Sequence, residues 1–320
     1  MGALDPDVGQ FMETLARMFP VPPADVSPTE RRLSFRQVHE QLLHPPPPPA
    51  FAGDIVDDIV ATDDGEVPVR VYSPATSTPT GPTLVFFPGG GWVIGDLETG
   101  DATARSLATQ MDLTVIAVDY RKAPEHPFPA AFEDARAAVR AVAQQRRPSW
   151  LGVAGDSSGG NLAAAVAIDC AAARHQCDGQ LLLYPALDPR MDTDSHRRYA
   201  RGYLLERELM EFYWTSYRAE APLDWHIAPA LAPDEMLSEV APVVVATAEL
   251  DPLHDEGRDY AGRLLGLGIA ATHLPGPGLI HGWVDHTGLV PAADQALRRA
   301  VAVFDALRRA STGDAATTER

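Results

Sequence analysis

The chain has 320 residues, of which 45% are hydrophobic and 22% are charged, and its formal net charge is -18. This length suffices for one large α/β domain or two smaller ones, and the composition is typical of a globular protein. The negative charge excludes nucleic acid and anionic membrane surfaces as favoured partners, because both would be repelled. No run approaches the ~20 apolar residues of a membrane span. We expect a small neutral ligand, no nucleic acid and no stable membrane association.

The two cysteines, Cys170 and Cys177, are too few for a disulfide framework. The N-terminal residues 1–7 are acidic and lack the apolar segment of a secretory signal peptide. We therefore expect reduced thiols and a cytoplasmic protein.

Two helical patterns open the chain, at residues 8–19 and 28–43, and five prolines follow at residues 45–49. Consecutive prolines adopt a stiff, extended polyproline II conformation. We predict that residues 1–49 form an N-terminal helical cap segment that ends in a Pro-rich spacer.

Beyond the prolines, short apolar strands alternate with helical patterns. This alternation indicates a mostly parallel sheet covered by helices on both faces. We predict an α/β fold with a central sheet of about eight strands, formed by residues 50–187 and 226–310. The expected strands are residues 55–61, 67–72, 83–87, 113–118, 151–154, 181–184, 243–248 and 270–274. The expected helices are residues 97–111, 130–145, 162–173, 256–267 and 291–307.

A long insertion interrupts the alternation of strands and helices, and we assign residues 188–225 to a cap insertion. It contains an expected helix at residues 206–218 with an aromatic stripe that includes Trp214. An insertion of this size is typical of a lid over the strand ends. The stripe packs against the body, lines a pocket, or does both. The polar residues 311–320 are expected to form a disordered tail.

Residues 155–159 read Gly-Asp-Ser-Ser-Gly, a G-x-S-x-G motif between an expected strand and an Ala-rich helix. In that setting the serine lies on a sharp turn, with its hydroxyl exposed at the top of the sheet. Small glycines allow the turn to form without clashes. Ser157 is therefore a candidate nucleophile for acyl transfer.

A serine nucleophile needs a base, and the base needs an orienting acid, in the chain order Ser, Asp or Glu, His. Three acids follow the strand at residues 243–248, and Asp251 is the best placed because Pro252 keeps it extended. Glu249 lies closer to the strand, and Asp255 is positioned as a helix N-cap.

Three of the ten histidines compete for the role of base. His281 follows the last expected strand and an expected Pro-Gly-Pro-Gly turn at residues 275–278. His273 lies inside that strand, and His286 is further toward the last helix. Chain order favours His281.

An oxyanion hole is the third requirement. The strand at residues 83–87 runs into Pro88 and a glycine-rich turn, where such a loop is expected. We predict that the N–H groups of Gly89, Gly90 and Ser158 donate to the oxyanion. We also expect Trp92, Tyr184 and Trp214 to line the substrate pocket.

Five segments together resemble the hormone-sensitive-lipase-like (bacterial family IV) carboxylesterases, from about Ile55 to Leu307. They are Gly89-Gly90-Gly91-Trp92 and residues 119–130, 155–161, 251–257 and 281–283. The resemblance implies an α/β-hydrolase fold with a helical cap and catalysis by Ser157, Asp251 and His281. It also implies short-chain acyl esters as substrates, no cofactor or metal, and a homodimer through the edge strand near residues 270–274.

Three positions depart from the family pattern. Pro88 replaces the histidine that usually opens the glycine motif, Ser158 replaces the commoner alanine, and Lys122 replaces a leucine that we interpret as structural. Pro88 leaves the donating N–H groups in place but puts the position of the loop, and hence the substrate preference, in question.

Two alternatives remain. One is an amidase or deacetylase acting on an acylated metabolite with the same three residues. The other is a non-catalytic receptor like the related plant hormone receptors, which lack the histidine that is present here.

Overall fold

The computed structural model describes residues 2–19, 26–43, 50–62 and 65–313. The predicted Pro-rich spacer, the turn at residues 63–64 and residues 314–320 of the predicted tail lie outside the described residues.

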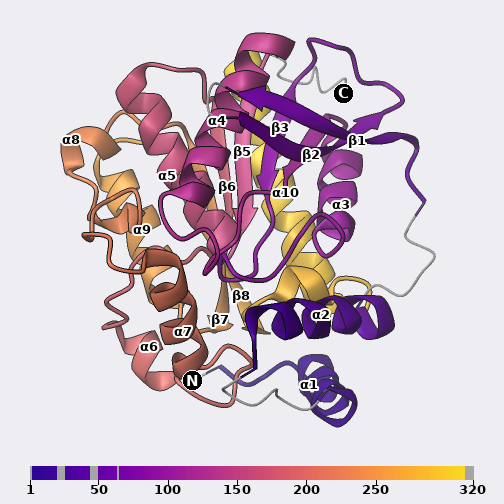
Figure 1. Ribbon diagram of the computed structural model, residues 1–320, viewed down its shortest axis with the longest axis vertical. Helices are drawn as coiled ribbons and strands as arrows, with labels where there is room; N and C mark the ends of the chain where they lie inside the picture. Colours follow the sequence, from indigo (N-terminus) through magenta and orange to yellow (C-terminus); the bar gives the residue numbers. More distant parts are fainter. Residues whose placement is uncertain (1, 20–25, 44–49, 63–64, 314–320) are drawn as a thin grey trace, which may run out of the picture.

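One sheet of eight strands forms the centre of the molecule, in the order β1-β2-β4-β3-β5-β6-β7-β8 (Figure 1). β2 pairs antiparallel with β1 and β4, and all the other pairs are parallel. The strands are β1 (Gly53–Thr62), β2 (Gly65–Pro74), β3 (Thr83–Phe87), β4 (Thr114–Val118), β5 (Leu151–Asp156), β6 (Gly179–Leu183), β7 (Val243–Leu250) and β8 (Ala271–Ile280). The predicted fold class is confirmed.

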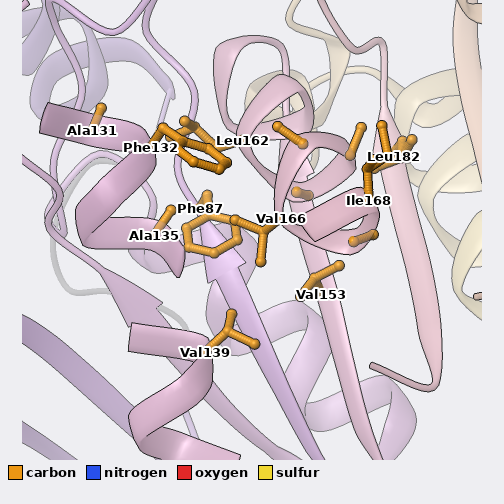
Figure 2. Packing of buried hydrophobic residues seen from close by; sticks show 14 of the residues in the cluster. Phe87, Ala131, Phe132, Ala135, Val139, Val153, Leu162, Val166, Ile168 and Leu182 are labelled. Atoms are coloured by element: carbon orange, nitrogen blue, oxygen red, sulfur yellow. The ribbon is translucent and has the colours of Figure 1, made fainter. Parts of the chain in front are cut away.

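Helices cover both faces of the sheet, as continuous apolar strands require. α4 (Ala130–Arg146), α5 (Ser158–Ala173) and α9 (His254–Gly266) share one hydrophobic cluster, and α3 (Asp101–Met111) and α10 (Pro291–Thr312) share the other. Figure 2 shows the first cluster, in which Phe132 and Ala135 of α4, Leu162 and Val166 of α5 and Phe87 of β3 come together. The many alanines of α5 let this helix lie close to the sheet.

A further group of helices lies at the end of the molecule where the parallel strands finish (Figure 1). Their bounds are α1 (Pro6–Met18), α2 (Pro28–Val38), the π-helical turn η1 (His39–Leu43), α6 (Asp194–Arg198) and α7 (Arg207–Arg218). α2 starts with a capping box between Ser27 and Glu30. The shorter elements η2 (Pro229–Leu231), α8 (Asp234–Leu237) and η3 (Trp283–His286) complete the described chain.

Several predicted boundaries were wrong; α5, for example, begins at Ser158 rather than residue 162. α3 begins at Asp101 rather than residue 97, because Asp96 and Thr99 hydrogen-bond to each other's backbone in a turn before the helix. α10 continues to Thr312, two residues into the predicted tail. Residues 275–278 form no turn, since β8 runs through them to Ile280 and pairs with β7. A strand at the sheet edge tolerates prolines because their missing N–H needs no partner strand.

Candidate active site

Ser157 occupies the turn between β5 and α5 in a strained conformation, with φ of 53° and ψ of -117°. Close packing explains the flanking glycines. A Cβ on Gly159 would lie 1.8 Å from the Phe87 carbonyl oxygen, and one on Gly155 would lie 2.2 Å from the backbone of Gly159. Only glycine fits at both places, so the motif is required for the turn that presents the serine.

The hydroxyl of Ser157 lies 2.9 Å from Nε2 of His281, and Nδ1 of His281 lies 2.8 Å from Oδ2 of Asp251. A carboxylate can only accept, so Nδ1 carries the proton and Nε2 accepts from the serine. Asp251 is fully buried, and its other oxygen accepts the N–H of Leu253 at 2.9 Å. The structure thus brings together the three residues that the sequence selected, in an unbroken hydrogen-bond chain.

The rival acids are engaged elsewhere. Glu249 accepts the N–H of Gly278 at 2.9 Å. Asp255 accepts the N–H of Ser195 at 2.8 Å and pairs with Arg258. The predicted N-cap role of Asp255 was wrong, because α9 already begins at His254 and its cap position is Leu253.

The rival histidines are also accounted for. His273 bonds to the Thr247 hydroxyl at 2.8 Å, and the ring of His286 packs on Phe11 with 4.2 Å between centroids. The histidine that contacts the Ser157 hydroxyl is His281.

The predicted role of Gly89 as an oxyanion donor was wrong, because its N–H donates to Oδ1 of Asp156 at 2.8 Å. The next two glycines turn back sharply, with φ of 120° at Gly90 and 59° at Gly91. Within the described part of the chain, the N–H groups of Gly90, Gly91 and Ser158 donate to no protein acceptor. Ser158 is the first residue of α5, where a free N–H is normal. Three donors are therefore available in residues that line the same cavity as Ser157.

The glycine loop is anchored on its other side as well. The buried hydroxyl of Tyr120 donates to the Pro88 carbonyl at 2.6 Å. Lys122 in turn lies 3.8 Å from the centre of the Tyr120 ring and pairs with Asp119 at 3.0 Å. Pro88 thus costs the loop a side-chain donor, while the backbone on both sides of it is still held.

Comparisons with known proteins show which family the chain belongs to. A family model described as the alpha/beta hydrolase fold matches residues 84–285. The chain is 36% identical to the carboxylic ester hydrolase LipN of Mycobacterium tuberculosis, over 88% of this chain and 77% of the relative. It is also 36% identical to the ethyl acetate hydrolase of Pseudomonas putida, over 80% of this chain and 83% of the relative.

The solved structure of a hyperthermophilic esterase from Pyrobaculum calidifontis superposes with a TM-score of 0.87 at 32% identity, covering 96% of this chain and 99% of that one. The chain belongs to the α/β-hydrolase family, in its hormone-sensitive-lipase-like branch. It is a carboxylic ester hydrolase.

In this α/β hydrolase, a cavity of about 1430 Å³ opens at Ser157 and His281. Its walls are largely apolar and come from α1, α2, the glycine loop and α7. Trp92, Tyr184 and Trp214 all line it, as do Asp156 and Asp285. The sequence predicted residues 1–49 as a helical cap segment but indicated none of their side chains as pocket residues, because two amphipathic helices at the start of a chain carry no local signal of what they cover.

The aromatic residues at the cavity are also packing residues. Trp92 stacks on Tyr217 with 4.3 Å between centroids and contacts Trp214 at 4.4 Å. Tyr184 packs edge-on against the His281 ring at 4.8 Å. The stripe on α7 therefore both packs and lines the cavity.

Asp156, which sequence reasoning passed over, sits immediately before Ser157. Burial raises its pKa to about 7, and the negative charge of Asp285 adds to this effect. No cluster of metal-ligating side chains occurs among the residues that the structure describes. Nor does any described helix have the length and apolar character needed to cross a bilayer.

Proposed function

We propose that this hydrolase cleaves short-chain acyl esters through an acyl-enzyme on Ser157. The observation that carries the proposal is the hydrogen-bond chain from Ser157 through His281 to the buried Asp251. Three N–H groups that donate to no protein acceptor among the described residues line the same cavity. A base in contact with the serine and an acid in contact with the base are what nucleophilic catalysis by a hydroxyl needs.

In the first half of the reaction, Nε2 of His281 takes the Ser157 proton while Oγ attacks the ester carbonyl carbon. The negative charge on the carbonyl oxygen is stabilised by the N–H groups of Gly90, Gly91 and Ser158. Asp251 orients the ring and stabilises its charged form. The C–O bond to the alcohol then breaks, and His281 returns the proton to the leaving alcohol.

In the second half, His281 removes a proton from water, whose oxygen attacks the acyl carbon. The second tetrahedral species collapses with release of the carboxylic acid, and the proton returns to Ser157.

The substrate class rests on the relatives and on the cavity. A relative at 36% identity is named for ethyl acetate, an ester of a two-carbon acid. The cavity is mainly apolar and exceeds the usual range for small-ligand sites, about 300–1,000 Å³. We therefore assign a short acyl group to the substrate, with room for a larger apolar alcohol. The esterase names of the relatives favour esters over the amides of an amidase or deacetylase.

Two further assignments belong to this proposal. β8 ends the sheet, and its outer edge near residues 271–274 is where we place a homodimer contact. Sedimentation velocity at two protein concentrations tests it. The two free cysteines fit the reducing cytoplasm that we assign to the protein.

A fluorophosphonate probe tests the proposal directly, because it reacts only with an activated serine. We expect the wild type to be labelled and Ser157→Ala to be unlabelled, with loss of p-nitrophenyl acetate hydrolysis by about 10⁴-fold or more. Equal labelling of the two proteins would contradict the proposal. Rates on matched acetate and acetamide substrates decide between ester and amide.

A further inference from the structure

α2 and η1 present three basic side chains to the protein body, at Arg32, Arg36 and His39. Spacings of four and three residues place them on one face of the helix. Each meets a carboxylate from a different segment of the body: Glu125 after β4, Asp96 before α3, and Asp285 in η3. The N-terminal helix thus contacts three separate segments through one row of charges.

Arg32 makes the most contacts of the three. Its Nε donates to the Val93 carbonyl at 2.7 Å, and its Nη2 donates to the Ala123 carbonyl at 3.0 Å. Its two terminal nitrogens also bind both oxygens of Glu125, at 3.0 and 2.6 Å. A planar guanidinium with four partners fixes position and angle, which a flexible surface pair does not.

The contacts of Arg32 and Arg36 reach the oxyanion loop. The N–H groups of Val93 and Ile94 both donate to the Gly90 carbonyl, at 3.1 and 2.8 Å. Arg36 binds Asp96. The segment directly after the donor glycines is therefore held by α2, whereas Asp156 and Tyr120 hold Gly89 and Pro88 directly before them.

His39 reaches the other catalytic loop. Its ring is buried, with Nδ1 at 3.0 Å from the Phe35 carbonyl and Nε2 at 3.7 Å from Oδ1 of Asp285. Because Nδ1 faces a carbonyl, it carries a proton, and a carboxylate opposite Nε2 favours a proton there as well. Asp285 lies in η3 and its N–H donates to the Gly282 carbonyl at 3.0 Å, immediately after His281.

We propose that Arg32 and Arg36 of α2 and His39 of η1 are positioning residues for catalysis. Arg32 and Arg36 hold the oxyanion loop in place, and His39 holds the loop that carries His281. Because the three side chains belong to one continuous helical segment, they fix the two loops relative to each other. None of these three side chains touches the reacting atoms. They act on catalysis through Gly90 and His281. The inference rests on the proposed roles of those two residues and assigns α2 a role beyond covering the cavity.

The protonation of His39 makes this role measurable. Burial alone would lower the pKa of His39, but the nearby carboxylate of Asp285 and the Phe35 carbonyl outweigh burial and raise it. The acidic groups facing the ring are Asp285 on η3 and Asp96 before α3, and Asp96 is itself bound by Arg36. The contact with Asp285 is therefore strongest at low pH and weakens as the pH rises through the pKa of His39.

The first experiment compares kcat and KM of the wild type, Arg32→Gln and His39→Gln on p-nitrophenyl acetate. We expect kcat to fall about tenfold with a much smaller change in KM, because misplaced catalytic groups slow the chemistry more than binding. Arg140→Gln is the matched control. Arg140 has the same side-chain exposure as Arg32, 31%, and pairs with Asp169 between α4 and α5. It should leave kcat unchanged.

The second experiment follows the ratio of wild-type to His39→Gln kcat between about pH 6 and pH 9. Taking the ratio removes the pH dependence that both proteins share. We expect the ratio to decrease as the pH rises, and Asp285→Asn should give the same trend from the other side of the contact. If one of these variants fails to fold, the other still tests the contact.

A lower melting temperature with unchanged kcat and a pH-independent ratio would overturn the inference and leave α2 a stabilising helix only. That outcome is distinct from failure of the proposed function. If the proposed function failed, the wild type itself would be inactive or Ser157→Ala would retain activity.

Discussion

The carboxylate of Asp156 accepts the N–H of Gly89 across 2.8 Å, so the residue before the proposed nucleophile also holds the loop that faces it. A Cβ on Gly89 would lie 2.1 Å from Oδ2 of the same carboxylate. The G-x-S-x-G turn and the glycine loop therefore form one packed unit, and the position between Gly155 and Ser157 has a structural role of its own.

Asp156→Asn tests the electrostatics of this unit. The folded-state pKa of Asp156 is raised to about 7, whereas an unfolded aspartate titrates near ~3.9. Between these values the folded protein holds a proton that the unfolded chain has lost, so this group stabilises the fold most at low pH and less as the pH rises toward 7. Asparagine cannot ionise, and its oxygen can still accept the N–H of Gly89.

We therefore expect Asp156→Asn to gain stability relative to the wild type as the pH rises from about 4 to about 7, with no further gain above that. Thermal unfolding of both proteins in a pH series measures the difference in stability between Asp156→Asn and the wild type. The contributions of other titrating groups cancel in this difference, because both proteins share them. A difference that is constant with pH would show that Asp156 does not titrate in this window.

Tyr120→Phe tests the second anchor of the loop. The change removes the donor to the Pro88 carbonyl and leaves a buried acceptor unsatisfied, at a cost of about 1–2 kcal/mol in the free energy of unfolding. We expect kcat to fall severalfold while KM changes little. Tyr260→Phe is the control, because Tyr260 is equally buried and its hydroxyl has no hydrogen-bond partner among the described residues. Equal kinetic effects of the two substitutions would count against loop anchoring.

Gly91→Ala tests the assignment of the oxyanion donors. Gly91 has a positive φ, and an added Cβ would lie 2.2 Å from the Tyr213 ring. Gly288→Ala is the matched control, since Gly288 also has a positive φ but open space around it. Each should lose about 1–2 kcal/mol of stability from backbone strain, and Gly91→Ala should lose more because the Tyr213 ring must move. We expect ester hydrolysis to fall by 10²-fold or more only in Gly91→Ala, where the donating N–H is displaced.

Leu33→Asp tests the use of the apolar cavity wall. Leu33 lines the cavity and its side chain is 58% exposed, whereas Leu265 is 61% exposed and lies outside the cavity. Each buried methylene of a substrate contributes ~0.8 kcal/mol against an apolar wall, and an added carboxylate removes part of that gain. We expect the kcat/KM ratio of octyl acetate to ethyl acetate, which differ only in the alcohol, to fall severalfold in Leu33→Asp. In Leu265→Asp the ratio should match the wild type, and a fall in both variants would contradict the assignment.

The local sequence was sufficient for features whose cause lies within a few residues. The glycines around Ser157 are demanded by contacts within one turn and with the adjacent strand, so the motif predicted the turn correctly. The alternation of apolar strands and helices predicted the sheet, because a buried parallel strand must be apolar on both faces. Chain order selected Asp251 and His281, and the tertiary structure places His281 in contact with Ser157 and Asp251 in contact with His281.

Only the tertiary structure decided which N–H groups are available. Gly89 and Gly90 look alike in sequence, and the choice between them depends on the Asp156 carboxylate, 67 residues away in the chain. Residues 275–278 form a strand because they pair with β7, although their prolines and glycines alone predict a turn. The row of Arg32, Arg36 and His39 is visible in the sequence, but its meaning comes from three carboxylates that long-range packing brings to one helix face. Local chemistry thus determines the turn and the elements, whereas the partners of each polar group are set by packing between segments far apart in the chain.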